Sequence, residues 1–432
     1  MPRAISLLTA LTSLVTLAGC SWSVFSDLED QAPATRIGQT GDIKSGAFGD
    51  SLVGLERGTE EGGALFASGN GDVSLSTVLF GKGGVISNTA TDAVKLKDFF
   101  GSPTRVRGVA RAPALPTGPA AYVASVAGGA GEVRVIDINR FGLGSTTTLK
   151  VLGSWATPVT DFGDSVVDGD FDGVGSRDDL AVGARDAVVA IAAVPGAWPM
   201  MNDAKPAVFS GGGFPKGDFT TIVAGEFDGA APGHEIVAGA PGQNTVVVIN
   251  RVKDCIDGTS CDGFVALAAP AGAKGFGGAL LVADVDGDGK QEVVVGAPDS
   301  AQVFVYGVTD PFALELEKTV ASPGPPSFGS ALAFGRFTQG DGLLAVGAPN
   351  AEAGGVPAAG KIFLYDRNLA ALGGGGVSLV GPEASMLVGR HLAVLPFRVG
   401  SQTHEVLAAS GRDAIFVFFS NLVPGHKDLR VR

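Results

Sequence analysis

The stretch "FGGALLVADVDGDGKQEVVVGAP", from Phe276 to Pro298, decides the fold because its plan recurs along the chain. It begins with Phe-Gly, passes through an apolar run and an aspartate-rich loop, and ends with a second apolar run that closes on Gly-Ala-Pro. Units with this plan start at residues 48, 100, 162, 219, 276, 328 and 388, so successive starts are 52 to 62 residues apart. A repeat at such a period indicates an architecture of stacked supersecondary units.

Each unit is typical of four short strands. In the fifth unit we expect them at Ala279–Ala283, Glu292–Gly296, Gln302–Tyr306 and Leu314–Val320. The middle two are valine-rich runs, as in strands that are buried on both faces, and the small Gly-Ala pair lets neighbouring sheets approach closely. Four-stranded sheets packed radially expose only short edges. We therefore predict an all-β, seven-bladed β-propeller of four-stranded blades over residues 33–432.

Closing such a ring needs one strand from a chain terminus. Two segments compete for this place: "ATRIGQT" at residues 34–40, and "HKDLRVR" at residues 426–432. The first precedes its Phe-Gly much as "LELEKTV" precedes the Phe-Gly of the sixth unit. We favour the N-terminal strand as the one that completes the seventh blade.

Composition limits the class of partner. Of the 432 residues, 45% are hydrophobic and 17% are charged, so the chain can bury a sizeable core. The formal net charge is −13 and the basic residues do not cluster, which argues against nucleic acid as a partner. An acidic surface fits cation binding or simple solubility.

The first twenty residues, "MPRAISLLTALTSLVTLAGC", have one arginine, an apolar stretch and then small residues, which is typical of an export signal. The end of this segment, Leu17-Ala18-Gly19-Cys20, resembles a bacterial lipobox. The resemblance implies a lipoprotein signal peptide at 1–19, a lipidated Cys20, and a tether over 20–32. Ser21 implies sorting to the outer membrane, on its periplasmic or surface side. The alternative is an ordinary signal peptide with a chance cysteine.

The two other cysteines, Cys255 and Cys261, lie close together in "KDCIDGTSCDG". Beyond an export signal, a close even pair usually forms a disulfide, and we expect one here that staples a hairpin tip. A zinc site is the alternative. It would need four ligands, and no histidine or further cysteine is near in sequence.

The acidic loop of the fifth unit has the composition of a calcium site. Asp284, Asp286, Asp288 and Glu292 occupy loop positions one, three, five and nine, and the backbone carbonyl of Lys290 would add another oxygen. Calcium takes six to eight oxygen ligands, and alternate carboxylates in a tight loop converge on one point. An EF-hand is excluded because Val295 stands at position twelve. The alternative is an acidic turn in solvent.

A second loop carries a weaker form of the pattern. Asp170 and Asp172 are followed by either Asp178 or Asp179 at the last ligand position, while Val174 replaces the middle acid. We predict possible calcium binding there. The corresponding loop of the fourth unit, which keeps Glu226, Asp228 and Glu235 around Ala230, we interpret as a plain turn.

Phe-Gly, an Asp-rich loop and Gly-Ala-Pro together resemble the FG-GAP repeat, as found in the propeller of integrin α-chains. The resemblance runs from about Thr35 to Phe419, and it is strong in the third to sixth units and loose in the others. It implies a seven-bladed propeller with calcium in some blade loops and with ligand contacts on one face.

The sequence contains no recognisable set of catalytic residues. The histidines are His234, His391, His404 and His426, and no nucleophile elbow, metalloprotease helix or P-loop occurs. His234 and His404 occupy matching places before the second strand of their units, which favours a structural role. Sialidase-type propellers use a tyrosine with an arginine cluster, whereas Tyr122, Tyr306 and Tyr365 all fall in predicted strands. We expect a protein that is not an enzyme.

The sequence therefore predicts a lipid-anchored, calcium-stabilised propeller that binds a protein or polysaccharide at the cell envelope, for adhesion or interaction. Two alternatives stay open: a structural subunit of a secretion or motility assembly, and a carbohydrate-active enzyme with an unrecognised site. The candidate contact loops are the longest departures from the minimal repeat: Pro195–Pro215, Cys255–Cys261 and Asn350–Lys361.

Overall fold

The structure is a computed structural model that describes most of the repeat region. The described residues are 34–37, 48–55, 63–69, 74–79, 92–95, 105–115, 118–127, 130–137, 151–156, 159–174, 177–192, 206–227, 233–310, 313–320, 322–337, 341–372, 378–399 and 401–418. The expected signal peptide, Cys20, the tether and the segment 426–432 lie outside them.

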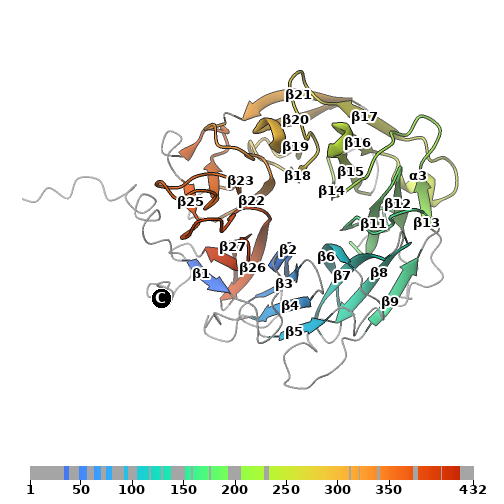
Figure 1. Cartoon of the computed structure of the whole chain (residues 1–432). Helices are drawn as coiled ribbons and strands as arrows, with labels where there is room; N and C mark the ends of the chain where they lie inside the picture. Colours follow the sequence, from blue (N-terminus) through green and yellow to red (C-terminus); the bar gives the residue numbers. More distant parts are fainter. Residues whose placement is uncertain are drawn as a thin grey trace, which may run out of the picture.

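The strands of this described part form seven four-stranded antiparallel sheets around a common centre (Figure 1). Three consecutive sheets hold β2 (Phe48–Leu55), β3 (Ala64–Gly69), β4 (Ser74–Leu79) and β5 (Asp92–Lys95); β6 (Arg105–Leu115), β7 (Gly118–Ala127), β8 (Ala130–Asp137) and β9 (Val151–Ala156); and β10 (Ser165–Gly169), β11 (Asp179–Ala184), β12 (Ala187–Ile191) and β13 (Pro206–Phe209).

The next three sheets follow the same order. They hold β14 (Thr221–Gly225), β15 (Glu235–Ala240), β16 (Thr245–Ile249) and β17 (Phe264–Ala268); β18 (Ala279–Ala283), β19 (Glu292–Ala297), β20 (Gln302–Asp310) and β21 (Ala313–Val320); and β22 (Ala331–Gly335), β23 (Leu343–Ala348), β24 (Lys361–Tyr365) and β25 (Ser378–Val380). Short helical turns connect some strands: η2 (Pro241–Gln243), α3 (Val252–Ile256) and η3 (Pro298–Ser300).

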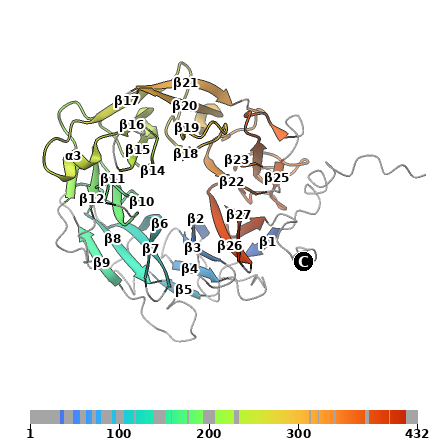
Figure 2. The same cartoon turned by 180° about the vertical axis from the view of Figure 1, so that it is seen from behind.

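The remaining sheet joins the two ends of the chain, in the order β1 (Ala34–Ile37), β28 (Ile415–Phe418), β27 (Gln402–Ser410) and β26 (Leu392–Val399). β1 is antiparallel to β28, with Ala34 opposite Phe418 and Ile37 opposite Ile415. Figure 2 shows this sheet from behind, with β1 on the outside of β27 and β26. The prediction that the N-terminal strand closes the ring is confirmed.

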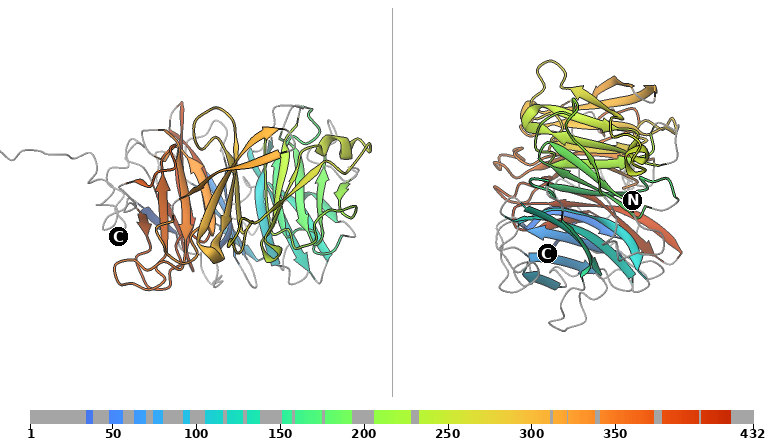
Figure 3. Two further views of the ribbon diagram at one scale, coloured as in Figure 1. Left: turned by 90° about the horizontal axis from the view of Figure 1, so that it is seen from above. Right: turned by 90° about the vertical axis from the view of Figure 1, so that its right-hand side faces the viewer.

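The innermost strands contact one another around a closed circle, in the order β2, β6, β10, β14, β18, β22, β26 and back to β2. Seen edge-on, the sheets make a thick disc (Figure 3). The predicted all-β class and the four-stranded blades are therefore confirmed. In the fifth unit the first strand has the expected bounds, while β19 ends one residue later than expected and β20 continues to Asp310.

The Phe-Gly and Gly-Ala-Pro elements of the repeat meet where adjacent sheets pack. Phe276 is fully buried, and Gly277 has a φ of +90°, a conformation that glycine adopts without steric cost. The Gly277 N–H donates to the Gly296 carbonyl at 3.0 Å. A Cβ on Gly239, in the preceding sheet, would lie only 2.3 Å from the Gly277 carbonyl oxygen. The small residues thus allow the close approach between sheets that the sequence predicts.

The second strands of the sheets form the core. β11, β15, β19 and β23 are buried along their whole length, which confirms that these valine-rich runs are covered on both faces. The residue that opens each unit from the third to the seventh is buried as well, at Phe162, Phe219, Phe276, Phe328 and Val388. Among the described residues, no helix is long and apolar enough to cross a membrane.

Candidate metal-binding loops

Two acidic loops connect the innermost strand of a sheet to its second strand. One joins β18 to β19, and the other joins β10 to β11. Because both loops follow the same strand in the repeat, they lie on the same face of the disc. These are the two loops for which the sequence predicts calcium.

In the loop between β18 and β19, carboxylate oxygens of Asp284, Asp286 and Glu292 lie within 4.8 Å of one another. Two ligands of one calcium ion, each about 2.3–2.6 Å from it, are at most about 5 Å apart, so these three acids can share an ion. Asp288 is not in this group; its Oδ1 accepts the Lys290 N–H at 2.8 Å. The structure therefore brings three of the five predicted ligand residues together.

The backbone of this loop is organised by its own aspartates. The Gly287 N–H donates to Asp284 Oδ1 at 2.6 Å, and the Asp288 N–H donates to Asp286 Oδ1 at 3.0 Å. Short aspartate side chains often fold a turn in this way. The acids thus shape the loop as well as offering oxygen ligands.

Glu292 is the buried member of the group, with 3% of its surface exposed. Its Oε2 accepts the Val285 N–H at 2.8 Å. Burial raises the pKa of Glu292 to about 7 and outweighs the Val285 hydrogen bond, which lowers it; the neighbouring acids of the loop raise it further. A divalent cation in the loop would offset this concentration of like charge.

Arg367 contacts the same loop from the neighbouring sheet, beyond the end of β24. Its Nη1 lies 3.2 Å from both the carbonyl oxygen and Oδ1 of Asp284. The guanidinium also stands over the Phe334 ring, 5.5 Å from its centroid. Sequence reasoning missed this cation because it belongs to another unit, 83 residues away.

In the loop between β10 and β11, oxygens of Asp170, Asp172 and Asp179 converge in the same way. Asp179, not Asp178, therefore fills the last position that the sequence left open. Asp179 is 1% exposed, and its Oδ2 accepts the N–H groups of Phe171 at 2.6 Å and Asp172 at 2.9 Å. Val174 is 66% exposed where the middle acid would stand.

The last acid of these loops has a structural role that sequence reasoning missed. Asp179 and Glu292 each accept the N–H of the second loop residue. Glu235 does the same in the fourth unit, where its Oε2 accepts the Phe227 N–H at 2.9 Å. Asp228 and Ala230 of that loop lie outside the described residues. Since Glu235 makes this bond in a loop interpreted as a plain turn, the bond alone does not indicate a metal.

Cys255 and Cys261 form the predicted disulfide, with their Cα atoms 4.5 Å apart. As expected, the two cysteines lie in the connection between the paired antiparallel strands β16 and β17, but Cys255 belongs to the short helix α3 rather than to a plain turn. Cys255 is 4% exposed and packs in the apolar cluster that includes Ile249 and Val252. The disulfide therefore ties α3 to the loop that leads into β17.

The three tyrosines considered for catalysis lie inside strands. Tyr122, Tyr306 and Tyr365 are buried in β7, β20 and β24, as expected, and the Tyr122 hydroxyl donates to the Asp178 carbonyl at 2.9 Å. Burial raises the pKa of Tyr306 to about 12. His426 lies outside the described part of the chain.

The candidate contact loops lie on both faces of the disc. The segment Asn350–Lys361 joins β23 to β24, and its exposed residues include Glu352 and Pro357. The connection Cys255–Cys261 joins the third and fourth strands of its sheet, so it lies on the opposite face, with the acidic loops. In Pro195–Pro215, the described residues are 206–215.

Radial four-stranded sheets, two of which carry an acidic loop after the innermost strand, define the protein as a β-propeller. Residues 276–309 match the family model of the FG-GAP repeat, so the resemblance drawn from the sequence is confirmed for the fifth unit. A comparison with curated proteins found no match. An FG-GAP β-propeller suggests an interaction or adhesion module, and such repeats often bind calcium.

Proposed function

We propose that this protein is a non-catalytic interaction module whose propeller is stabilised by calcium in the loop between β18 and β19. The observation that carries the proposal is the convergence of Asp284, Asp286 and Glu292 inside the segment that matches the FG-GAP repeat. Oxygen ligands at this spacing suit calcium, and Gly289, with a φ of +91°, permits the sharp turn. The loop formed by Asp170, Asp172 and Asp179 is the second proposed calcium site.

The first experiment measures calcium binding by the full-length protein in detergent, by calorimetry and thermal melting. Wild type is expected to bind calcium and to melt at a higher temperature with it, because a ligand that binds only the folded state stabilises that state. Asp286→Ala should reduce both effects. Asp299→Ala, which removes an exposed acid from η3 on the same sheet, is the matched control. Equal binding by wild type and Asp286→Ala would exclude this loop.

We also propose that the chain is a bacterial outer-membrane lipoprotein, anchored through lipid on Cys20. The support is the lipobox-like sequence that ends at this cysteine. Metabolic labelling with a radioactive fatty acid should mark wild type but not Cys20→Ala. Labelling of both proteins, or of neither, would contradict the anchor.

The partner we propose is a protein or polysaccharide of the envelope or of its surroundings, bound by the loops of a rigid disc. The support is a closed ring with a buried core and with long connections that carry exposed residues, such as Asn350–Lys361. Envelope fractions are tested for binding to the protein in calcium, after protease digestion or periodate oxidation. Loss of binding after protease indicates a protein ligand, and loss after periodate indicates a polysaccharide. Binding that survives both treatments would contradict this proposal.

A further inference from the structure

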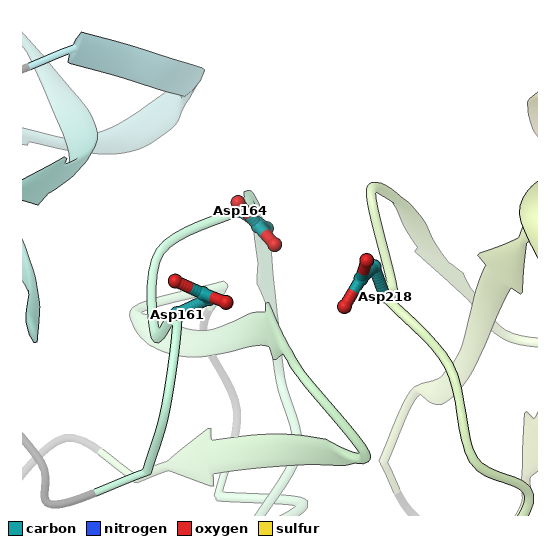
Figure 4. Close-up of side chains that lie close together, drawn as sticks. All are labelled: Asp161, Asp164 and Asp218. Carbon is teal, nitrogen blue, oxygen red and sulfur yellow. The ribbon is translucent and has the colours of Figure 1, made fainter. Parts of the chain in front are cut away.

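A third group of acids lies at the other end of β10 from the predicted loops (Figure 4). Asp161 and Asp164 flank the Phe-Gly pair before β10, and Asp218 precedes the opening phenylalanine of the next sheet. Oxygens of all three lie within 4.8 Å of one another. Because the loop with Asp170 follows β10 and this group precedes it, the two lie on opposite faces of the disc.

The backbone holds this group at the boundary between two sheets. The Asp164 N–H donates to the Gly183 carbonyl at 3.1 Å, and the Arg185 N–H donates to the Thr160 carbonyl at 3.0 Å. Across the boundary, the Gly217 N–H donates to Asp186 Oδ1 at 2.8 Å. The three acids are therefore positioned by connections of β10, β11 and β14 rather than by one flexible loop.

Asp164 is the member of this group that has a buried oxygen without a hydrogen bond. Its side chain is 6% exposed, and its buried Oδ1 accepts no hydrogen bond from any described residue. The nearest cation is Arg107, whose Nε lies 3.6 Å from this oxygen, beyond hydrogen-bonding distance. A buried carboxylate oxygen without a hydrogen bond is costly. Burial also raises the pKa of Asp164, which agrees with this environment.

Arg185 partly neutralises the group from its solvent side. Its Nη2 lies 2.5 Å from Asp161 Oδ2, and its Nε lies 3.1 Å from Asp218 Oδ1. The arginine side chain is 53% exposed, so its release into water costs little. Three carboxylates against Arg185 and Arg107 leave the group with one net negative charge, while Oδ1 of Asp164 has no hydrogen-bond donor among the described residues.

We propose that Asp161, Asp164 and Asp218 form a binding site for a hard divalent cation of the calcium class, which displaces Arg185 from the acids. The oxygen spacing fits one ion with ligand distances of about 2.3–2.6 Å, and water reaching the exposed side supplies the remaining ligands. The ion links the sheet of β10 to the sheet of β14. This site is independent of the two predicted loops, because it shares no residue with them.

The test uses the full-length protein in detergent, with both predicted loops disabled by Asp286→Ala and Asp172→Ala. In this background, calorimetry should still find one calcium ion per chain, and Asp164→Asn should abolish it. Arg185→Gln should strengthen the binding about fivefold, because it removes an exposed competing charge. Asp299→Asn is the control for loss of an exposed acid. If Asp164→Asn does not fold, Asp218→Asn, whose side chain is 53% exposed, takes its place.

Crystals soaked in Mn²⁺ give the position of the ion from its anomalous scattering. A peak between the three carboxylates, with Arg185 turned away, is the expected result. Absence of that peak, together with no calcium binding in the loop-disabled protein, would overturn the proposal and leave a static ion-pair network. Failure of the predicted loops would appear instead as unchanged calcium binding on Asp286→Ala alone, so the two failures are distinguishable.

Discussion

His234 and Asp170 exchange two hydrogen bonds across the boundary between neighbouring sheets. The Asp170 N–H donates to His234 Nδ1 at 3.0 Å, and the His234 N–H donates to the Asp170 carbonyl at 2.6 Å. The imidazole is an acceptor here, so it must be neutral, and burial lowers its pKa, with Arg177 adding to the effect. The histidine thus holds the acidic loop of the adjacent sheet, which is the structural role that its repeated position predicts.

Replacing His234 with alanine should lower the free energy of unfolding by about 1–2 kcal/mol, because the half-buried Asp170 N–H loses its acceptor. His234→Asn offers an oxygen in a similar place and should recover part of that loss. Chemical denaturation measures both. His404→Ala is the matched control, because His404 occupies the corresponding place in the seventh unit. There Glu405, rather than the histidine, bonds to the loop of the adjacent sheet: its Oε2 accepts the Arg336 N–H at 2.6 Å. Equal losses for the two alanine variants would contradict this assignment.

Changing Glu292 to glutamine should separate the structural and metal roles of this side chain. The amide oxygen can still accept the Val285 N–H, and the buried charge disappears, so stability without calcium should be unchanged or slightly higher. The rise in melting temperature with calcium should be lost or strongly reduced. Thermal melts in calcium and in a chelator measure this. A full calcium effect in Glu292→Gln would show that this acid is not a ligand.

Removing the charge of Arg367 should strengthen calcium binding in the loop between β18 and β19. Arg367→Met keeps an apolar stem over Phe334 but removes the cation beside Asp284, so the affinity should rise about threefold to tenfold. Calorimetry on the full-length protein measures it. Lys274→Met removes an exposed positive charge just before the start of the fifth unit and should have little effect. Weaker binding in Arg367→Met would mean that the arginine positions Asp284 rather than competes for it.

The disulfide should stabilise the region of α3. By loop-closure entropy, a ring this short contributes about 2 kcal/mol to the free energy of unfolding. Cys255→Ser with Cys261→Ser should lose that amount in chemical denaturation, and reduction of wild type should give the same loss. Reduction of the double variant should have no further effect. If wild type is equally stable with and without reductant, the bond does not constrain the unfolded chain appreciably.

Acid should destabilise the protein partly through His391. Burial, with the nearby Arg390, lowers the pKa of His391 from 6.5 to about 4. The unfolded chain therefore takes up a proton at this histidine below about pH 6.5, while the folded chain does so only near pH 4. The free energy of unfolding should fall as the pH drops through this interval. His391→Asn should flatten the pH dependence there, and an unchanged profile would contradict the argument.

Most of the fold could be predicted from the repeat, because the same local sequence pattern recurs in each unit. The pattern has fixed places for Phe276, for Gly277 and for the valine-rich second strand. In the structure each of them lies at a contact between sheets. The convergence of Asp284 and Asp286 also follows from local spacing. In the loop between β10 and β11, one inserted residue prevented the sequence from showing whether Asp178 or Asp179 is the last ligand.

Contacts between units could not be predicted, because no local spacing encodes them. Arg367 reaches Asp284 from another sheet, and His234 reaches Asp170 in the same way. The group with Asp164 is similar: the two segments that supply it come together only when the ring forms. The cysteine spacing predicted the disulfide correctly but could not reveal α3, since a covalent pair does not specify the backbone between its members.

The pairing of β1 with β28 sets the order in which this molecule can be completed during synthesis. The four residues of β1 leave the ribosome before every other strand of the ring, yet their partner is the last strand to be made. Through almost all of translation, β1 has no native neighbour, and the sheet that it belongs to does not exist. The other sheets can form in chain order, but the circle stays open until β28 is present. A nascent chain that stalls late therefore exposes strand edges that the finished protein never shows.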